Sequence, residues 1–229
     1  MANDQEKEAA AQASLRFVED GQVVGLGTGS TAAHFINLLG GRVKAGLRVR
    51  GIPTSVRSEA LAKSLGIPLT TLDECPEIAV TVDGADEVDP QLRLIKGGGG
   101  ALLREKIVAS ATKKLVIVAD ASKRVAMLGK FPLPVEVIKF AKTLVTGKIA
   151  RMGAHVQLRT NDDGTAYLTD ENNYILDCRF GEIGDAEGLA RELSDMPGVV
   201  EHGLFIGMAS VVLVADGGKV LELRRGEQS

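Results

Sequence analysis

The chain has 229 residues and a formal net charge of −3, with 45% hydrophobic and 25% charged residues. These values are typical of a folded globular protein and exclude a chain that is disordered throughout. Aromatic residues make up only 3% of the chain and no dense basic block occurs, so neither nucleic acid nor a membrane surface is an expected partner.

Strand-like and helix-like segments alternate through the first half of the chain. In chain order, the predicted elements are a helix at 6–19, a strand at 23–26, a helix at 32–39, a strand at 48–52, a helix at 55–65, a strand at 78–82, a helix at 101–111 and a strand at 115–119. The strands are almost continuously apolar, which is typical of a parallel sheet covered by helices on both faces. The sequence therefore predicts a Rossmann-like, doubly wound α/β domain with a mainly parallel sheet.

The pattern changes at Pro132 and Pro134. Beyond them the sequence predicts short strands at 156–159, 167–169 and 174–178, a helix at 186–193, and strands again at 210–214 and 220–223. We therefore expect a catalytic α/β domain made of residues 1–131 and 206–229, into which a smaller α+β domain, residues 132–205, is inserted.

The chain carries no signal for export or membrane insertion. The first 13 residues lack the apolar core of a signal peptide, and no apolar run approaches the roughly 20 residues of a transmembrane helix. The two cysteines, Cys75 and Cys178, do not form a Cys-x-x-Cys pair. We therefore expect reduced thiols, a cytoplasmic location and no membrane partner.

A first glycine loop, residues 25–31, joins a predicted strand to a helix. Glycines let the backbone approach a ligand closely, and the free N–H groups of the following helix suit an anion. Ser30 stands where a dinucleotide fingerprint needs glycine, and the lysine of a Walker loop is absent. A phosphate or sugar hydroxyls are the expected ligands of Thr28, Gly29, Ser30 and Thr31, although a plain turn with a helix cap is an equal alternative.

Acidic residues follow the strand predicted at 78–82, in the run Asp83-Gly84-Ala85-Asp86-Glu87. Carboxylates at the mouth of a parallel sheet can bind sugar hydroxyls and shuttle protons, and they can also hold Mg²⁺. For Glu87, and for Asp89 beyond it, a solvated loop with a turn cap explains the acids as well.

Four consecutive glycines follow Lys96. Such a run has a high conformational entropy and is typical of a backbone that approaches a ligand. Lys96 can stabilise a phosphate or a developing negative charge, and Glu105, in the helix that follows, can act as a general base. Residue chemistry alone favours a simpler interpretation, in which Glu105 is an exposed partner of Arg104 and Lys106.

A fourth segment, residues 118–123, also ends a predicted strand. Lys123 could complete a phosphate pocket, while an ordinary turn capped by Asp120 or Ser122 is the alternative. The three histidines are not spaced as metal ligands, and no Gly-x-Ser-x-Gly elbow of a hydrolase occurs. We therefore assign none of the histidines to a metal or to catalysis, and a Ser–His–Asp hydrolase is not expected.

Together these segments resemble the ribose-5-phosphate isomerase family of type A. The matching segments are residues 25–35, 82–87, 96–106, 119–123, 129–137, 169–173 and 197–205. The resemblance implies the interconversion of D-ribose 5-phosphate and D-ribulose 5-phosphate in the pentose phosphate pathway, without metal or organic cofactor. It also implies a ferredoxin-like smaller domain and a homodimer or homotetramer.

The resemblance further implies a role for each residue. Glu105 corresponds to a general base that acts through a cis-enediolate. Asp83 and Asp86 correspond to acids that assist ring opening, and Lys96 to a cation near the reacting oxygens or the phosphate. The substrate-binding positions that it implies are Thr28, Gly29, Ser30, Thr31, Asp83, Gly84, Ala85, Asp86, Lys96, Gly97, Gly98, Gly99 and Lys123.

Two other functions are compatible with the same architecture. One is a related enzyme of sugar phosphates, such as a deaminase or a lactonase. The other is a non-catalytic domain that binds a sugar-phosphate effector, which would need a helix-turn-helix unit for which the short N-terminus leaves no room.

Overall fold

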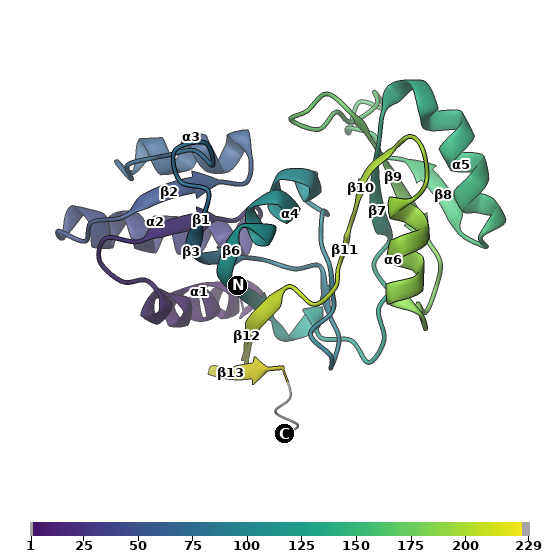
Figure 1. Cartoon of the computed structure of the whole chain (residues 1–229). Helices are drawn as coiled ribbons and strands as arrows, with labels where there is room; N and C mark the ends of the chain where they lie inside the picture. The colour runs from purple at the N-terminus through teal and green to yellow at the C-terminus, as the bar shows by residue number, and fades with distance from the viewer. Residues whose placement is uncertain (1, 226–229) are drawn as a thin grey trace. The chain divides into compact units, whose positions relative to one another are not determined.

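The structure is a computed structural model that describes residues 2–225, and the chain forms two compact units (Figure 1). Unit 1 takes in Met1–Ala85, Arg104–Arg124 and Met208–Ser229, and unit 2 takes in Asp86–Leu103 and Val125–Gly207. The domain boundaries expected from the sequence, at 131/132 and 205/206, stay a prediction. The compact units differ from those domains, because residues 86–103, 125–131 and 206–207 belong to unit 2.

Unit 1 is built on a six-stranded sheet with the order β13-β12-β6-β3-β1-β2. Its elements are α1 (Ala2–Ser14), η1 (Leu15–Phe17), β1 (Val23–Leu26), α2 (Ser30–Lys44), β2 (Arg50–Pro53), α3 (Val56–Ser64), β3 (Ile78–Asp83), most of α4 (Leu102–Ser110), β6 (Thr112–Asp120), η2 (Ala121–Lys123), β12 (Ala209–Asp216) and β13 (Lys219–Arg224). All neighbouring strands are parallel except β12 and β13. The predicted Rossmann-like α/β fold is confirmed.

Helices pack on both faces of this sheet. On one face, Phe35 and Leu39 of α2 share an apolar core with Leu26 of β1. On the other face, Val108 of α4 packs with Ile52 of β2. Because helices cover both faces, ligands reach such a sheet at its edge, at the carboxyl ends of the parallel strands. In unit 1 these are the ends of β1, β3 and β6.

Unit 2 contains two antiparallel sheets, with the orders β10-β7-β9-β8 and β11-β5-β4. Its elements are β4 (Glu87–Val88), β5 (Leu94–Ile95), β7 (Leu133–Val137), η3 (Lys139–Ala141), α5 (Lys142–Arg151), β8 (His155–Leu158), β9 (Tyr174–Arg179), α6 (Ala186–Ser194), β10 (Val199–His202) and β11 (Leu204–Phe205). The larger sheet and its two helices follow the chain order β-α-β-β-α-β, which is the ferredoxin-like arrangement expected from the resemblance.

Several features of unit 2 differ from the sequence-based predictions, which also lack the short strands β4, β5, β10 and β11. The strand predicted at 167–169 is wrong, since only an isolated bridge between Thr160 and Ala166 forms there. The sequence did not predict β7, in which Pro134 lies opposite Asp177 and accepts a hydrogen bond through its carbonyl group instead of donating one. It also did not predict α5, whose first residues include Thr, Val, Thr and Gly, all weak helix formers.

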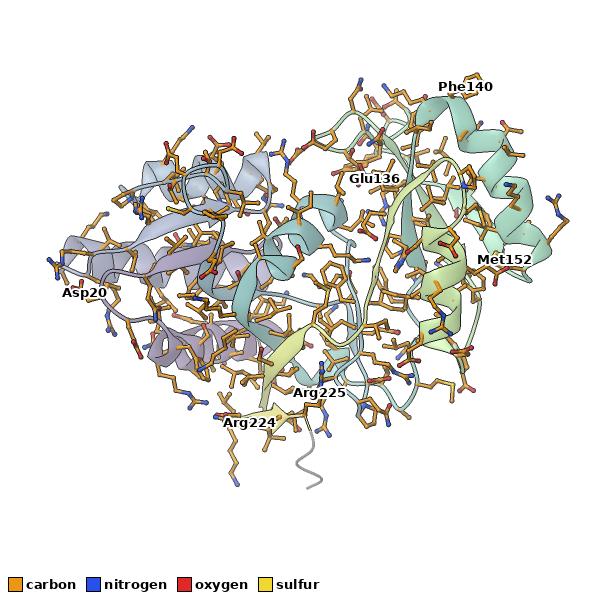
Figure 2. The ribbon with its side chains drawn as sticks, viewed as in Figure 1. Asp20, Glu136, Phe140, Met152, Arg224 and Arg225 are labelled. Atoms are coloured by element: carbon orange, nitrogen blue, oxygen red, sulfur yellow. The ribbon has the colours of Figure 1, made fainter. Side chains whose placement is uncertain are left out.

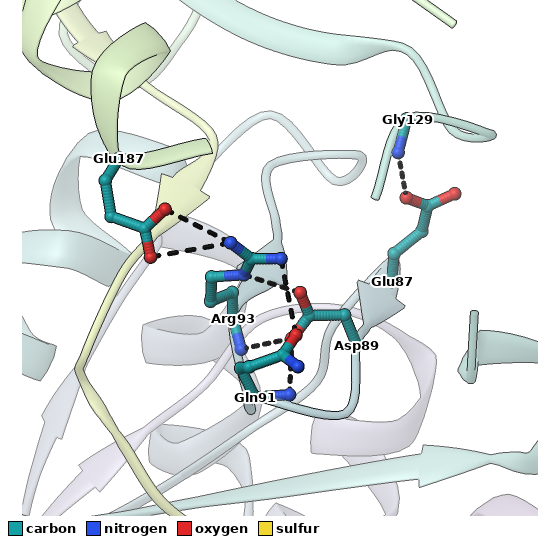
Figure 3. Close-up of polar contacts among 6 residues, drawn as sticks. All are labelled: Glu87, Asp89, Gln91, Arg93, Gly129 and Glu187. Carbon is teal, nitrogen blue, oxygen red and sulfur yellow. Dashed lines mark hydrogen bonds and ion pairs between the residues drawn. The ribbon is translucent and has the colours of Figure 1, made fainter. Parts of the chain in front are cut away.

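Glu87 is a buried carboxylate that stabilises a loop of unit 2 (Figure 3). Its side chain is 2% exposed and accepts hydrogen bonds from the backbone N–H groups of Gly129, at 2.7 Å, and Phe131, at 2.5 Å. Backbone donors offset the cost of burying a charged group. The solvated position that the sequence allowed for Glu87 is therefore wrong.

Asp89 caps the turn that connects β4 and β5, as the sequence allowed, but it is buried and not solvated (Figure 3). Its carboxylate accepts hydrogen bonds from the backbone N–H groups of Gln91, at 3.0 Å, and Arg93, at 2.9 Å. The Arg93 guanidinium pairs with the same carboxylate at 2.6 Å and with Glu187 of α6 at 3.1 Å. This network connects the smaller sheet to α6 within unit 2.

Both cysteines are free thiols, as the sequence predicts. Cys178 lies in β9, where burial and the nearby charge of Asp177 raise the pKa of its thiol to about 12. Since the thiolate is the nucleophilic form, Cys178 is a poor nucleophile at neutral pH. Within residues 2–225, no helix has both the length and the apolar character that a membrane crossing requires.

Candidate active site

The first glycine loop lies against the end of β3 in unit 1. The N–H of Gly27 donates to the carbonyl of Val82 at 3.0 Å. Asp83, only 1% exposed, accepts hydrogen bonds through Oδ1 from the N–H groups of Thr28, at 3.0 Å, and Gly84, at 2.8 Å. A Cβ at Gly27 would lie 2.6 Å from the Cα of Asp83, so only glycine permits this close approach.

A cluster of hydroxyl groups holds the same loop from the end of β2. The Thr28 hydroxyl lies 2.7 Å from that of Thr54 and 2.8 Å from that of Ser55. The Ser58 hydroxyl donates to the carbonyl of Gly27 at 2.6 Å. Sequence reasoning missed these three contact residues, although a signal existed. Thr54 and Ser55 follow a strand at the same sheet edge, and Ser55 caps α3.

The N-terminus of α2 follows this loop directly. Gly29 takes a φ of 105°, in a region that strongly favours glycine, and α2 starts at Ser30. The first N–H groups of a helix have no partner within the helix and suit an anion. Ser30 is exposed and Thr31 is partly exposed, so both hydroxyls are accessible for hydrogen bonding to a ligand.

Lys123 ends the 3-10 turn that follows β6, the strand next to β3. Asp120, 1% exposed, caps this turn by accepting the N–H of Ser122 at 3.0 Å, as one of the sequence interpretations held. Because β3 and β6 are parallel neighbours, Lys123 follows the same sheet edge as Asp83. A cation and the first glycine loop thus belong to one edge of unit 1.

Glu105 lies in the first turn of α4 and is 4% exposed. The exposed position that residue chemistry alone favoured is therefore wrong. A buried carboxylate is costly unless it is paired or used, and buried acids of this kind are typical of functional sites.

Lys96 follows β5 in unit 2 and is 3% exposed. Its backbone N–H donates to the carbonyl of Gly203 at 2.9 Å, and its ammonium nitrogen lies 5.4 Å from the centre of the Phe205 ring. The strand pair β5 and β11 therefore fixes the point at which the second glycine loop begins.

The second glycine loop forms a tight turn beside Asp86. The N–H of Gly98 donates to Oδ2 of Asp86 at 2.7 Å, and the N–H of Gly100 donates to the carbonyl of Gly97 at 3.0 Å. Gly97 and Gly100 have φ angles of 98° and 83°, which require glycine. Gly98 and Gly99 are exposed, so this backbone is accessible to a ligand.

The predicted site residues are divided between the two units. Unit 1 holds Thr28, Gly29, Ser30, Thr31, Asp83, Gly84, Ala85, Glu105 and Lys123, and unit 2 holds Asp86, Lys96, Gly97, Gly98 and Gly99. Direct hydrogen bonds join Asp83 to Thr28 and Gly84 in unit 1, and Asp86 to Gly98 in unit 2. Within the described part of the chain, no three His, Cys, Asp or Glu side chains are arranged to hold a metal ion.

Known proteins resemble this chain over nearly its full length. Residues 50–219 match the family model of ribose 5-phosphate isomerase A (phosphoriboisomerase A). A ribose-5-phosphate isomerase A from Parvibaculum lavamentivorans is 54% identical over 220 residues, which cover 93% of this chain and 95% of that protein. The protein of the same name from Nitrobacter hamburgensis is 53% identical and covers 98% of this chain and 100% of its own.

Solved structures agree. The ribose 5-phosphate isomerase A of Methanocaldococcus jannaschii is 44% identical, with a TM-score of 0.93 over 97% of this chain and 99% of that one. A D-ribose-5-phosphate isomerase in complex with phospho-erythronic acid is 40% identical, with a TM-score of 0.95 over 98% of this chain and 100% of that one. The chain therefore belongs to the ribose 5-phosphate isomerase A family.

Proposed function

We propose that the protein is an aldose–ketose isomerase that interconverts D-ribose 5-phosphate and D-ribulose 5-phosphate in the non-oxidative pentose phosphate pathway. One observation carries the proposal. A relative named ribose-5-phosphate isomerase A is 53% identical over a stretch that covers 98% of the chain, and so includes both glycine loops and the acidic segment between them. The substrate, the roles of the residues and the mechanism below belong to this proposal.

Glu105 carries the proton transfer in this proposal. In the ring-opened aldose, its carboxylate removes the proton from C2, a C1–C2 double bond forms, and the carbonyl oxygen takes up the negative charge. The resulting cis-enediolate receives a proton at C1 from the Glu105 carboxyl group, and the hydroxyl proton moves from O2 to O1, so that the ketone forms at C2 and a hydroxyl group at C1. General base catalysis of this kind contributes about 10²- to 10⁴-fold to the rate. The buried position of Glu105 supports the role, because a fixed carboxylate is already oriented.

Lys96 and the second glycine loop stabilise the enediolate oxygens. The Lys96 side chain is buried, and a positive charge in a water-poor environment acts more strongly on a developing oxyanion. The N–H of Gly99 adds a hydrogen bond, whereas those of Gly98 and Gly100 hold the loop itself. One such donor typically lowers a barrier by about 3 kcal/mol. No metal or organic cofactor takes part in the proposed reaction.

The remaining residues bind and open the sugar. Asp83 and Asp86 accept hydrogen bonds from hydroxyl groups and move the proton that ring opening requires. The phosphate binds to the N-terminus of α2, with the hydroxyls of Ser30 and Thr31, and Lys123 adds a positive charge. This assignment is supported by the helix N–H groups that begin at Ser30 and by the position of Lys123 at the same sheet edge.

Proton NMR of the protein with ribose 5-phosphate in D₂O that contains EDTA tests the proposal. We expect ribulose 5-phosphate with deuterium at C1, and at least about a 100-fold loss of kcat in Glu105→Gln. The matched control is Glu136→Gln, since Glu136 is also a buried carboxylate and glutamine keeps the acceptor that Thr169 and Asn173 use. Activity that vanishes with EDTA and returns with Mg²⁺ or Mn²⁺ would contradict the mechanism.

Other outcomes separate the alternative functions. A folded protein that binds ribose 5-phosphate without converting it would favour an effector-binding domain. Release of ammonia from an amino-sugar phosphate, or hydrolysis of a phosphogluconolactone, would favour the related enzymes instead.

We also propose that the chain forms a homodimer or homotetramer. In unit 2, the apolar side chains of Ile138, Phe140 and Leu144 are 42%, 98% and 56% exposed, and Figure 2 shows Phe140 pointing outward near the start of α5. Exposed apolar side chains in one segment are typical of an interaction surface. We expect Phe140→Ser to lower the mass measured by light scattering, and an unchanged oligomeric mass would exclude this surface as the interface.

A cytoplasmic location belongs to the same proposal. Its support is that Cys75 and Cys178 are both free thiols, which is typical of proteins in a reducing compartment. Fractionation of cells that produce a tagged chain tests it, and recovery outside the cytoplasm would contradict it.

A further inference from the structure

Arg159 holds the second glycine loop from the opposite side to Asp86. Its Nη1 donates to the carbonyl of Gly97 at 2.9 Å and to that of Gly98 at 3.2 Å. The residues in contact are 62 and 61 positions apart along the chain, and all of them lie in unit 2.

The Arg159 side chain is itself fixed. Its Nε donates to Oδ2 of Asp177 at 2.9 Å, and its Nη2 donates to Oδ1 of the same carboxylate. The backbone N–H of Arg159 donates to the carbonyl of Ile175, and its carbonyl accepts the N–H of Tyr167, both at 2.9 Å. A guanidinium that binds a carboxylate through two parallel hydrogen bonds has a defined orientation, so its remaining N–H groups point in a defined direction.

Because the peptide group is planar, the contacts of Arg159 with the loop carbonyls also fix the directions of the loop N–H groups. In a trans peptide, the carbonyl of one residue and the N–H of the next point in opposite directions. The peptide between Gly97 and Gly98 is held at both ends, since its oxygen binds Arg159 and its N–H binds Asp86. The carbonyl of Gly98 also binds Arg159, so the N–H of Gly99 faces away from the guanidinium.

Tyr167 restricts the end of the same loop. A Cβ at Gly100 would lie 2.1 Å from the Tyr167 hydroxyl oxygen, so the ring packs directly against the backbone at this position. The guanidinium carbon of Arg159 lies 5.9 Å from the centre of the same ring. Arg159 and Tyr167 therefore stabilise one conformation of a glycine run that would otherwise sample many.

We propose that Arg159, oriented by Asp177, is a positioning residue that aims the N–H of Gly99 in the second glycine loop at an oxygen of the substrate. This inference rests on the proposed isomerase function and names a residue that acts on that reaction through the loop. Lysine cannot replace Arg159, because one ammonium group cannot reproduce the planar fork that binds Asp177 and two carbonyl groups together.

The test compares Arg159→Lys and Arg159→Gln with Arg93→Gln. Arg93 is a matched control because its side chain is 17% exposed against 14% for Arg159, and it also pairs with carboxylates within unit 2. The readouts are the kinetics of ribose 5-phosphate isomerisation, thermal unfolding, and hydrogen–deuterium exchange of the peptide that spans residues 96–103.

We expect both Arg159 variants to lower kcat/KM by about 100-fold, as a misplaced donor does, and to speed exchange in residues 96–103. Arg93→Gln should keep kcat/KM within about 2-fold of the wild-type value, because it removes no contact with the loop. This should hold even if its Tm falls by as much as the Tm of the Arg159 variants. Equal losses of activity in the Arg93 and Arg159 variants at equal losses of Tm would overturn the proposal. So would unchanged exchange in residues 96–103.

A failure of the proposed function gives a different result. In that case the wild type does not isomerise ribose 5-phosphate, while the exchange measurement still reports on the loop. Faster exchange in the Arg159 variants of such a protein would support the positioning of the loop, and unchanged exchange would overturn it.

Discussion

The two glycine loops are held in different ways, although each connects a strand to a helix. The first loop runs from β1 into α2 and packs directly against the main chain of β3 at Val82 and Asp83. The side chains of Asp83, Thr54 and Ser58 add hydrogen bonds to it. The second loop follows β5, a strand of only two residues, and is held mainly by the side chains of Asp86, Arg159 and Tyr167.

This difference shows two physical solutions to the same problem. A loop embedded at the edge of a parallel sheet has a conformation fixed by close packing, so an added methyl group should do the most damage there. A loop outside regular structure depends on side chains from distant parts of the chain, so their removal should matter more than a small change in volume.

The largest expected difference in stability between the two loops is that between the variants Gly27→Ala and Gly98→Ala. A Cβ at Gly27 would meet the backbone of Asp83, which cannot move without disturbing β3, whereas a Cβ at Gly98 would meet the end of the Asp86 side chain. We expect Gly27→Ala to lower the free energy of unfolding by about 3 kcal/mol and Gly98→Ala by about 1 kcal/mol, measured by urea denaturation.

Gly41→Ala is the control for this pair. A Cβ there would have no other atom within 4 Å, and Gly41 lies within α2, where alanine is the better helix former. This variant should be as stable as the wild type or more so. Equal effects at Gly27 and Gly98 would contradict the distinction between the two loops.

Removing the Asp83 side chain from the first loop should destabilise the protein more than removing the Asp86 side chain from the second loop. Asp83 accepts two hydrogen bonds from backbone N–H groups of unit 1, and Asp86 accepts one from Gly98 in unit 2. Because an N–H that loses its acceptor is costly when buried, we expect Asp83→Ala to lower the free energy of unfolding by about 2 kcal/mol and Asp86→Ala by about 1 kcal/mol. Urea denaturation of both variants measures these losses. A larger loss of stability in Asp86→Ala than in Asp83→Ala would contradict the prediction.

The parallel sheet could be predicted from the sequence because its strands carry an unmistakable pattern. β1 spans the predicted residues 23–26, and the strand predicted at 115–119 lies within β6. Unit 2 was harder, because its elements are short and contain residues that usually interrupt structure. Pro134 reads as a boundary but lies in β7, a strand with neighbours on both sides, where pairing and burial outweigh local preference.

The candidate site was predictable where its residues are neighbours in sequence. Glycine runs and acids at strand ends are local signals, and they identified Asp83 and Asp86, whose carboxylates contact the loops. The hydroxyl of Ser58 and the guanidinium of Arg159 gave no comparable signal, because their contacts with the loops span 31 and 62 residues. Such contacts exist only once the chain has folded, and residue types alone do not specify them.

The hydroxyl cluster offers a smaller test of the first loop. Ser58→Ala removes the hydrogen bond from the Ser58 hydroxyl to the carbonyl of Gly27. We expect a loss of at least about 1 kcal/mol in the free energy of unfolding, since this buried hydrogen bond is lost together with those to the hydroxyls of Ser55 and Thr28, while the volume changes little. Ser64→Ala is the control, because the Ser64 hydroxyl binds the carbonyl of Leu61 at an exposed position. Equal losses would mean that the contact with Gly27 contributes nothing specific.

The smallest expected effect on the second loop comes from Glu136, which supports the loop only indirectly. This residue of β7 is fully buried, and Figure 2 marks its position in unit 2. Its Oε1 accepts hydrogen bonds from Thr169, at 2.9 Å, and Asn173, at 3.0 Å, and so holds the turn that follows Tyr167. Burial raises the pKa of the Glu136 carboxyl group above its usual value, despite these two donors.

The raised pKa sets the sign of the expected pH dependence. Between the pKa of the unfolded chain and the higher pKa of the folded protein, the folded state binds more protons, so stability falls as the pH rises through this interval. Glu136→Gln keeps the acceptor for Thr169 and Asn173 but cannot ionise. We therefore expect the variant to match the wild type at acidic pH and to be more stable than the wild type at pH 8.

Urea denaturation of both proteins from pH 4 to pH 8 measures this difference. A variant that is less stable than the wild type at pH 8, but not at pH 4, would show that the ionised carboxylate stabilises the turn. In that case the side chains that support the second loop would include a buried charge. The second loop would then depend on distant side chains more strongly than its neutral hydrogen bonds alone indicate.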